Sequence, residues 1–442
     1  MKTRGTKRWL AVWLTALVAV AALAGAGCGD DDDDDGGGGG DGGSSSSSGG
    51  SKAPGGTIKV GTIGSLAGIG GVFAGFQAGV QGYFEYYNSQ DGIDGTQVEF
   101  VQVDDGGDPG KAAAGARKLV TQDKVLAIVG MASLADAAVA KYLNSAGVPV
   151  VGGWATSSSW HDPNDNMFVS LEGPNKPYCT VWSNTLAKAE GVTSTSYIAQ
   201  DFPAATGDAD CRATAGEKVG IKKAGDRIDV ALTAADYRPA MQRAIGTGAD
   251  GIYFSTGTDG QLKGIQAGEQ LGYEGKYIPT QPAGLEQGLA SIAGSLDGRV
   301  LTSGFSVLPS DPDSVSEELA AFKKGMAEFQ PKFANEITAV SGWAAGRMFA
   351  DALKAAGDDQ EAMIEYLRGL KDYTFGDLQG PMDWSNGSVP NPCVANLVMN
   401  GGKFGHPEGT EPGEWDCTPL INWDTGATEV FPQYEKNIED AQ

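Results

Sequence analysis

The sequence predicts an α/β fold with two doubly wound parallel-sheet lobes, and two observations carry this prediction. From Thr57 onward, short apolar runs typical of buried strands alternate with segments whose apolar residues recur at helical spacing. The stretch EGPNKPYC at residues 172–179 interrupts the alternation, and its two prolines and one glycine indicate a crossover. Successive βα units of this length favour a parallel sheet with helices on both faces, and the interruption divides them into two lobes.

In the first half of the chain, the helix patterns have recognisable faces and starts. Apolar side chains recur at helical spacing from Phe73 to Tyr87, and Pro109 after Asp108 is a favoured helix start. The predicted strands are 57–63, 96–103, 125–130 and 148–153, and the predicted helices are 73–87, 109–123 and 134–147.

The second half of the chain repeats this pattern. The predicted strands are 195–201, 227–233 and 250–256, and the predicted helices are 209–220, 237–248, 311–329 and 338–356. Beyond Gly376 the sequence is rich in turn residues and short strand patterns. A second α/β domain therefore follows the first.

The N-terminus is typical of a secretory signal. Basic residues precede an apolar run from Trp9 to Ala26, and small residues precede Cys28. We expect residues 1–27 to be a signal peptide and the protein to be exported. The alternative is a single membrane-spanning anchor, although the run is close to the lower length limit for a span.

Residues 28–56 are predicted to form a disordered tether. GDDDDDDGGGGGDGGSSSSSGGS follows Cys28 and has no apolar residue, so the first packed element begins near Thr57. The Asp30–Asp35 run is interpreted as a solvated spacer and not as a metal site, since nothing bends it around an ion. Ala26-Gly27-Cys28 resembles the lipobox of bacterial lipoproteins, in which the cysteine is acylated and becomes the mature N-terminus.

The cysteine count agrees with a lipidated Cys28. The chain has 5 cysteines, and an exported protein with an odd number needs an explanation for the unpaired thiol. Lipidation of Cys28 leaves four cysteines for two disulfides. Three connectivities are possible, and short loop closure favours Cys179 with Cys211 and Cys393 with Cys417. A zinc site is the competing interpretation, but the sequence has no CxxC pair.

Charge and loop chemistry argue against nucleic acids and nucleotides as partners. A formal net charge of −24 repels a phosphate backbone. The glycine-rich stretch at residues 68–73 places Phe73 where a dinucleotide-binding loop needs its third glycine, and no Gly-Lys-Ser or Gly-Lys-Thr triplet follows. We expect no cofactor.

The chain resembles periplasmic binding proteins of the branched-chain-amino-acid type. The resemblance rests on TIGSLAG at the first strand, on an aspartate pair followed by Asp108-Pro109, on a Val-Gly after the third strand and on a Gly-Val-Pro before the fourth. DYRPAMQRAIGTGADGIYF and FGDLQGPMDWSNG are similar to later segments of that family. The resemblance extends from residue 57 to about 431 and implies a type I, or venus-flytrap, fold with hinge strands between the lobes.

The resemblance also implies lobe boundaries and partners. Lobe 1 would comprise residues 57–173 and 304–376, lobe 2 would comprise 174–303 and 377–431, and 432–442 would be a tail. A protein of this kind captures a small-molecule ligand, is held at the outer membrane face by its lipid, and delivers the ligand to an ABC permease. A sensor that docks on a membrane receptor is the alternative.

In the first lobe, the resemblance places ligand contacts after the third and fourth strands. Ser133 could hold a carboxylate with its hydroxyl and the amides behind it, or it could simply cap its helix. Trp154 and Thr156 follow a buried strand on a glycine-containing turn and are predicted to contact the ligand. Phe73 lies about where the family has a ligand-contacting aromatic residue, and it could equally be the first core residue of its helix.

In the second lobe, the resemblance points to Asp201 and Gln281. The amino-acid binders of the family hold the ligand's ammonium group with an acid near the position of Gln281, and that acid is missing here. Asp201 or Asp259 could substitute for it. We therefore expect a small carboxylated or amide compound with an apolar or aromatic body, with a branched-chain amino acid as the alternative.

A hydrolase is the competing class of function. Ser157, Ser158 and Ser159 lie close in sequence to His161 and Asp162. However, adjacent His and Asp side chains are poorly placed for the orienting hydrogen bond of a triad, and no Gly-x-Ser-x-Gly elbow exists. The sequence therefore favours binding without catalysis.

Overall fold

A computed structural model describes most of the chain after the tether. The predicted signal peptide 1–27, Cys28 and most of the tether lie outside the described residues, as do residues 67–72. Among the described residues, no helix is long and apolar enough to cross a membrane. The structure describes residues 53–66, 73–162, 165–172, 178–179, 182–282, 284–310, 316–385, 391–410, 413–422 and 425–440.

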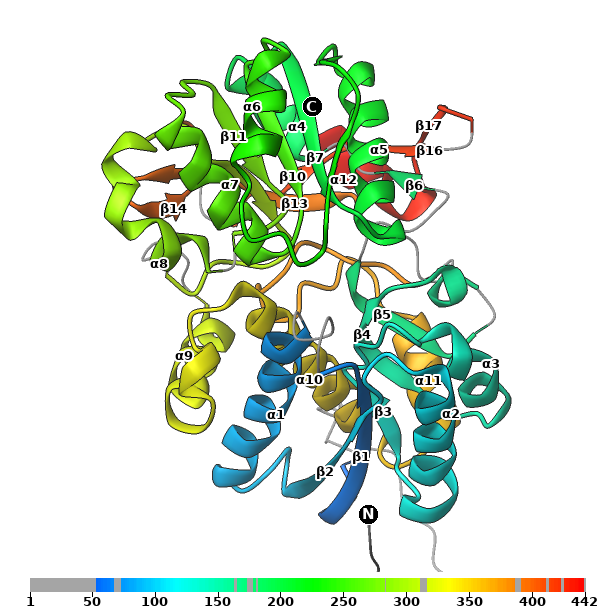
Figure 1. Cartoon of the computed structure of the whole chain (residues 1–442). Helices are drawn as coiled ribbons and strands as arrows, with labels where there is room; N and C mark the ends of the chain where they lie inside the picture. The colour runs from blue at the N-terminus through cyan, green and yellow to red at the C-terminus, as the bar shows by residue number, and fades with distance from the viewer. Residues whose placement is uncertain are drawn as a thin grey trace, which may run out of the picture. The chain divides into compact units, whose positions relative to one another are not determined.

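The first lobe is built on a parallel sheet of 5 strands in the order β2-β1-β3-β4-β5 (Figure 1). Because successive strands are connected by helices, every strand of this sheet runs in the same direction, as predicted. The strands are β1 (Gly56–Gly64), β2 (Thr96–Asp104), β3 (Ala127–Val129), β4 (Val150–Ala155) and β5 (Met167–Glu172).

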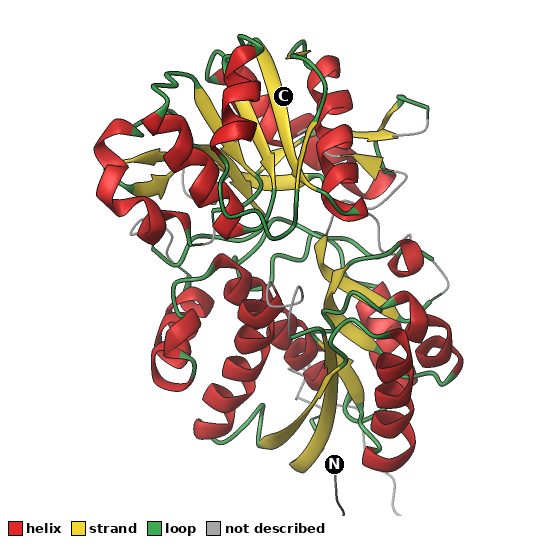
Figure 2. Cartoon of the chain, viewed as in Figure 1, coloured by secondary structure: helices red, strands yellow, loops and turns green. Residues whose placement is uncertain are grey.

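Helices cover both faces of this sheet, with α1 and α10 on one face and α2 and α3 on the other (Figures 1 and 2). The start predicted at Asp108 is confirmed, since its carboxylate accepts a hydrogen bond from the Lys111 N–H at 2.8 Å. The helices are α1 (Ala74–Ser89), α2 (Pro109–Lys118) with a π turn (Leu119–Asp123), α3 (Ala137–Ser145), α9 (Glu317–Phe329), α10 (Ile337–Ala356) and α11 (Gln360–Arg368).

Helices α1 and α10 touch through glycines. A Cβ on Gly79 would overlap the carbonyl oxygen of Ala339, and a Cβ on Gly342 would overlap the carbonyl oxygen of Phe76. The two backbones can approach this closely only where no side chain stands between them. This contact fixes α10, which lies late in the sequence, inside the first lobe.

The second lobe has a parallel sheet in the order β11-β10-β7-β8, with β9 also paired to β7. Successive residues of its strands pack on opposite faces. Ile198 and Phe254 belong to a core with α6 and α7, whereas Tyr197 and Tyr253 belong to a core with α4 and α5. The strands are β7 (Ser194–Gln200), β8 (Lys222–Lys223), β9 (Ile228–Val230), β10 (Gly251–Ser255) and β11 (Lys276–Pro279).

Two helices of this lobe were predicted from the sequence, whereas the helices at 182–189, 258–270 and 285–289 were not. One boundary differs: the helix predicted from residue 209 begins at Pro203, because a proline at the first helical position is a favoured start. The helices are α4 (Trp182–Ala189), α5 (Pro203–Lys218), α6 (Arg238–Gly246), α7 (Thr258–Gln270) and α8 (Leu285–Leu289).

The remaining strands are short and antiparallel. One sheet has the order β12-β13-β14 with β15 paired to β13, and a second has the order β17-β16-β6. Their bounds are β6 (Tyr178–Cys179), β12 (Leu301–Gly304), β13 (Cys393–Asn400), β14 (Lys403–Gly405), β15 (Asp416–Cys417), β16 (Leu420–Asn422) and β17 (Thr428–Glu429), and helix α12 (Glu435–Asp440) follows.

The hydrophobic core of the first lobe contains residues from both halves of the chain. Its buried members lie at 60–171 and 307–384, whereas the second-lobe cores contain residues of 186–308 and 397–404 together with Ile337 at the start of α10. The chain therefore passes between the lobes three times, near residues 172–182, 304–308 and 384–393. Leu378, Met382 and Trp384 belong to the first core, although the predicted boundaries assign them to lobe 2.

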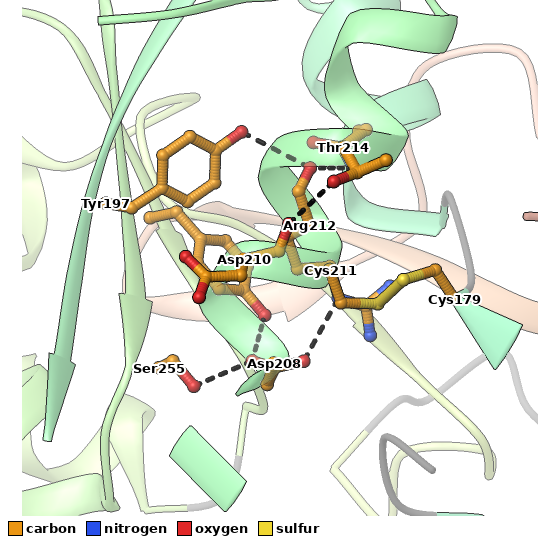
Figure 3. The surroundings of a disulfide bond; sticks show 10 residues. Cys179, Tyr197, Asp208, Asp210, Cys211, Arg212, Thr214 and Ser255 are labelled. Atoms are coloured by element: carbon orange, nitrogen blue, oxygen red, sulfur yellow. Dashed lines mark hydrogen bonds and ion pairs between the residues drawn. A yellow bond between two sulfur atoms is a disulfide. The ribbon is translucent and has the colours of Figure 1, made fainter. Parts of the chain in front are cut away.

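Both predicted disulfides are confirmed. Cys179 is bonded to Cys211 (Figure 3), and Cys393 is bonded to Cys417. Within the segment named as a tail, residues 432–440 form a 3₁₀ turn and helix α12, and the side chain of Tyr434 is only 1% exposed.

We predict that Gly342→Ala destabilises the protein by about 3 kcal/mol, because the added methyl group meets backbone that has no room to move. The free energy of unfolding in urea measures the effect. Gly246→Ala is the matched control: it also lies in a helix, and a Cβ there meets nothing within 4 Å. The control should stay within about 1 kcal/mol of the parent, and equal losses in both variants would contradict the close approach.

Candidate functional site

The buried carboxylate of Asp105 joins the ends of three strands in the first lobe. Asp105 follows β2, is 0% exposed, and lies at the sheet edge where open α/β folds bind ligands. Its Oδ1 accepts hydrogen bonds from Ser65 Oγ (2.6 Å) and the Gly107 N–H (2.7 Å), and its Oδ2 accepts one from Ser133 Oγ (2.5 Å). A buried carboxylate is stable only when its oxygens are bonded in this way, so the three strand ends are held together.

The hydroxyl group of Ser133 is engaged inside the lobe. It donates to Asp105 and accepts a hydrogen bond from the Ala135 N–H at 2.9 Å. The N–H of the next residue, Leu134, donates to Ser65 Oγ at 3.0 Å. The structural role of Ser133 is therefore to hold the Asp105 carboxylate and not to cap helix α3, and its contact with a ligand stays a prediction.

Asp136 organises the neighbouring loop and was not identified from the sequence. Helix α3 begins at Ala137 with Asp136 as N-cap, so the helix does not open at Ser133 as expected. The Asp136 side chain accepts hydrogen bonds from the Ala137 N–H (2.6 Å), the Thr156 N–H (2.9 Å) and Trp160 Nε1–H (2.8 Å). Thr156 Oγ1 also donates to the carbonyl of Ser133 at 2.6 Å, which ties the end of β4 to the end of β3.

Two of the predicted aromatic residues lie in contact. The Phe73 and Trp154 rings pack edge to face with centroids 4.9 Å apart, and Phe76 lies 6.0 Å from the Trp154 ring. Phe73 is 3% exposed and belongs to the first-lobe core, whereas Trp154 is half-buried. The indole of Trp154 is therefore the one of these two rings that keeps surface for a ligand.

The corresponding edge of the second lobe is rich in amides. Gln200 Oε1 accepts a hydrogen bond from the Gly257 N–H at 3.1 Å. Gln261 is 0% exposed, and its Nε2 donates to the Thr256 carbonyl (2.7 Å) and to Thr280 Oγ1 (2.8 Å). These bonds join the ends of β7, β10 and β11 without a charged group.

The acidic candidates of this lobe lie at its surface. Asp201 is exposed, Gln281 is half-buried, and the Asp259 carboxylate forms an ion pair with Lys263 at 2.5 Å. Burial and the charge of Asp259 raise the pKa of Tyr237 above its usual value of 10.0, so its phenol stays protonated near neutral pH.

A second buried carboxylate, Asp208, supports the end of β10 from helix α5. It accepts hydrogen bonds from Tyr253 Oη (2.8 Å) and Ser255 Oγ (2.7 Å) and pairs with Arg212 at 3.3 Å (Figure 3). The Arg212 guanidinium also stacks over Trp182, 5.2 Å from the ring centroid. Asp208 and Arg212 lie four residues apart on α5, but Asp208 falls just outside the helix predicted at 209–220, so this pair was not recognised from the sequence.

The residues behind the hydrolase alternative lie in the loop after β4. Ser157 Oγ lies 2.5 Å from Ser159 Oγ, Asp162 is exposed, and His161 is half-buried.

The family comparison gives the class of the protein. The family model described as "Periplasmic binding protein" matches residues 57–403. The chain therefore belongs to this family, and by that membership it is a solute-binding protein. Its two lobes of parallel sheet agree with the type I fold of such proteins.

Several solved structures share the fold at low sequence identity. A solute-binding protein from R. palustris in complex with 4-hydroxybenzoate is 23% identical, with a TM-score of 0.64, covering 81% of this chain and 98% of that one. A branched-chain amino acid substrate-binding protein from Streptococcus pneumoniae in complex with isoleucine is 21% identical, with a TM-score of 0.63, covering 80% and 99%. A branched-chain amino acid ABC transporter protein from Thermus thermophilus with bound valine is 14% identical, with a TM-score of 0.67, covering 87% and 99%. No curated protein sequence matches the chain.

We predict that Ser133→Ala lowers the free energy of unfolding by about 1–3 kcal/mol, because Asp105 loses a donor while remaining buried. Chemical denaturation measures the loss. Ser145→Ala is the control, since this hydroxyl lies at the exposed surface of the same lobe and bonds only to the Lys141 carbonyl. If Ser133→Ala were as stable as the control, the role assigned to the Asp105 cluster would be wrong.

Proposed function

We propose that the protein is an extracytoplasmic lipoprotein that captures a small molecule between its two lobes and delivers it to an ABC permease. The observation that carries this proposal is the family membership over residues 57–403. The strand-end edges of the two lobes supply polar groups, and the first adds a partly exposed indole, which is the composition of a small-molecule site.

The ligand is a small carboxylated or amide compound with an apolar or aromatic body. Trp154 offers a flat apolar surface, and Gln281 in the second lobe is a neutral, half-buried partner for a hydroxyl or amide group. A bare ammonium group would be unfavourable beside such residues unless Asp201 or Asp259 reached it. Fold relatives whose solved structures hold 4-hydroxybenzoate and isoleucine support both the preferred ligand class and its alternative.

The lipid anchor is proposed at Cys28. Both disulfides use the other four cysteines, which leaves Cys28 as the unpaired one. A long tether of Asp, Gly and Ser follows it and would let the lobes reach a permease at some distance from the membrane surface.

Titration calorimetry tests the ligand class. We expect 4-hydroxybenzoate to bind more tightly than isoleucine, and Trp154→Ala to weaken binding by about 10-fold or more, since a buried aromatic contact contributes about 1–3 kcal/mol. Tyr142→Ala is the control, because this half-buried aromatic residue of the same lobe packs beside Arg117 on the outer helices. Tight isoleucine binding that survives Trp154→Ala would instead favour an amino acid held by an acid in the second lobe.

Membrane fractionation tests the anchor. In a host that processes bacterial lipoproteins, the parent protein should sediment with membranes and Cys28→Ala should be released into the soluble fraction. Retention of the variant on membranes would contradict lipidation at this residue.

A further inference from the structure

The C-terminal residues 413–440, which we name the strap, lie beyond the part of the chain that matches the family model. That match ends at residue 403. Figure 1 shows the strap elements β16, β17 and α12 beside β6 and α5 of the second lobe. The described residues of the strap contact two of the three places where the chain passes between the lobes.

The strap is fixed to the second-lobe side by covalent and sheet contacts. Strand β15 pairs antiparallel with β13, with Cys417 opposite Cys393, and the disulfide joins the same two residues. The Asp416 carboxylate accepts hydrogen bonds from Asn396 Nδ2 (2.7 Å) and from Thr185 Oγ1 on α4 (2.9 Å). This end of the strap must therefore move with the second lobe.

The middle of the strap pairs with the first passage between the lobes. Strand β16 runs antiparallel to β6, with Ile421 opposite Cys179 and Asn422 opposite Tyr178. The rings of Phe431 and Tyr178 pack edge to face with centroids 5.0 Å apart. Since Cys179 is in turn bonded to Cys211 on α5, β6 is held to the second lobe as well.

The end of the strap contacts residues packed with the first lobe. Tyr434 Oη accepts a hydrogen bond from the buried Asp383 N–H at 3.1 Å, and both neighbours of Asp383 belong to the first-lobe core. Trp415 packs on Gly380, where an added Cβ would lie 3.1 Å from the indole. Asn437 Nδ2 donates to the Asp372 carboxylate at 3.5 Å. The strap thus spans both sides of the hinge.

We propose that the strap restrains rotation of the lobes and disfavours the closed form, and so sets the affinity for the ligand. In the conformation that carries the strap contacts, Ser133 and Thr156 bond within the first lobe and Gln261 bonds within the second. Rotation toward a ligand moves the first-lobe contacts of the strap relative to its fixed end. A contact made in only one of two conformations shifts the equilibrium toward that conformation.

The contact region has room for such movement. A solvent-open pocket of about 390 Å³ separates Trp415 and Asn437 of the strap from Pro381 and Asn396, which lie on either side of the third passage in sequence. The strap therefore contacts the first lobe through only a few residues, and removing those contacts should let the lobes rotate more freely.

The test combines Tyr434→Phe with Asn437→Ala, which removes the strap's hydrogen bonds to Asp383 and Asp372, and compares this variant with Val430→Ala. Val430 lies in the same segment and is 44% exposed, so its truncation leaves the strap contacts intact. Spin labels on Lys141→Cys and Lys222→Cys, exposed residues of the two lobes, report the interlobe distance in a Cys28→Ala background with both disulfides intact. We expect a broader distribution that extends to shorter distances in the double variant and no change in Val430→Ala.

Calorimetry with 4-hydroxybenzoate and isoleucine gives a second readout. The apparent affinity rises with the population of the closed, binding-competent form. In the double variant, the Kd of whichever probe binds should therefore fall about 3- to 10-fold, because one buried hydrogen bond that opposes closure is lost. If the distance distributions of the double variant were identical to those of the parent, or if its Kd rose, the proposed role of the strap would be wrong. If neither probe binds, the proposed ligand class fails, but the ligand-free distances still decide the strap.

Discussion

The binding edge of the first lobe depends on one desolvated charge, the carboxylate of Asp105. Removing such a group from water is unfavourable unless donors surround it, and here the donors come from the ends of neighbouring strands. Separating these strand ends would leave the charge buried and unpaired, so the edge keeps its geometry in the absence of a ligand. Asp136 has the same effect on the loop after β4. Preorganisation of this kind reduces the ordering that binding must provide.

The regular elements could be predicted because their signal is local. Apolar runs such as TIKVGTI identify strands whatever the rest of the chain does, and α10 was found from spacing alone. The buried aspartates could not be identified in this way. Asp105 lies beside Asp104 in the sequence, yet it is Asp105 that is buried, and this difference arises from strands that meet only in the folded chain.

At the C-terminal end of the chain, one feature could be predicted from the sequence and another could not. The pairing of Cys393 with Cys417 followed from loop length, which the sequence contains. The sequence assigned residues 432–442 to a tail and gave no sign of the turn and helix at 432–440. Burial of Tyr434 depends on Asp383, 51 residues earlier, and such a non-local partner leaves no periodic pattern in the sequence.

The two proposals together place determinants of affinity and of specificity in different parts of the chain. The free energy of capture is the contact energy with the ligand less the work of reaching the closed form. The strap contacts contribute to that work equally for every ligand, because Tyr434 and Asp383 bond to each other within the protein. In the proposed site, Trp154 and Gln281 at the strand ends are the residues that would contact the ligand itself, so we expect them to discriminate between ligands. Substitutions in the strap can consequently change how tightly all ligands bind while the order of preference among them stays as the strand-end residues set it.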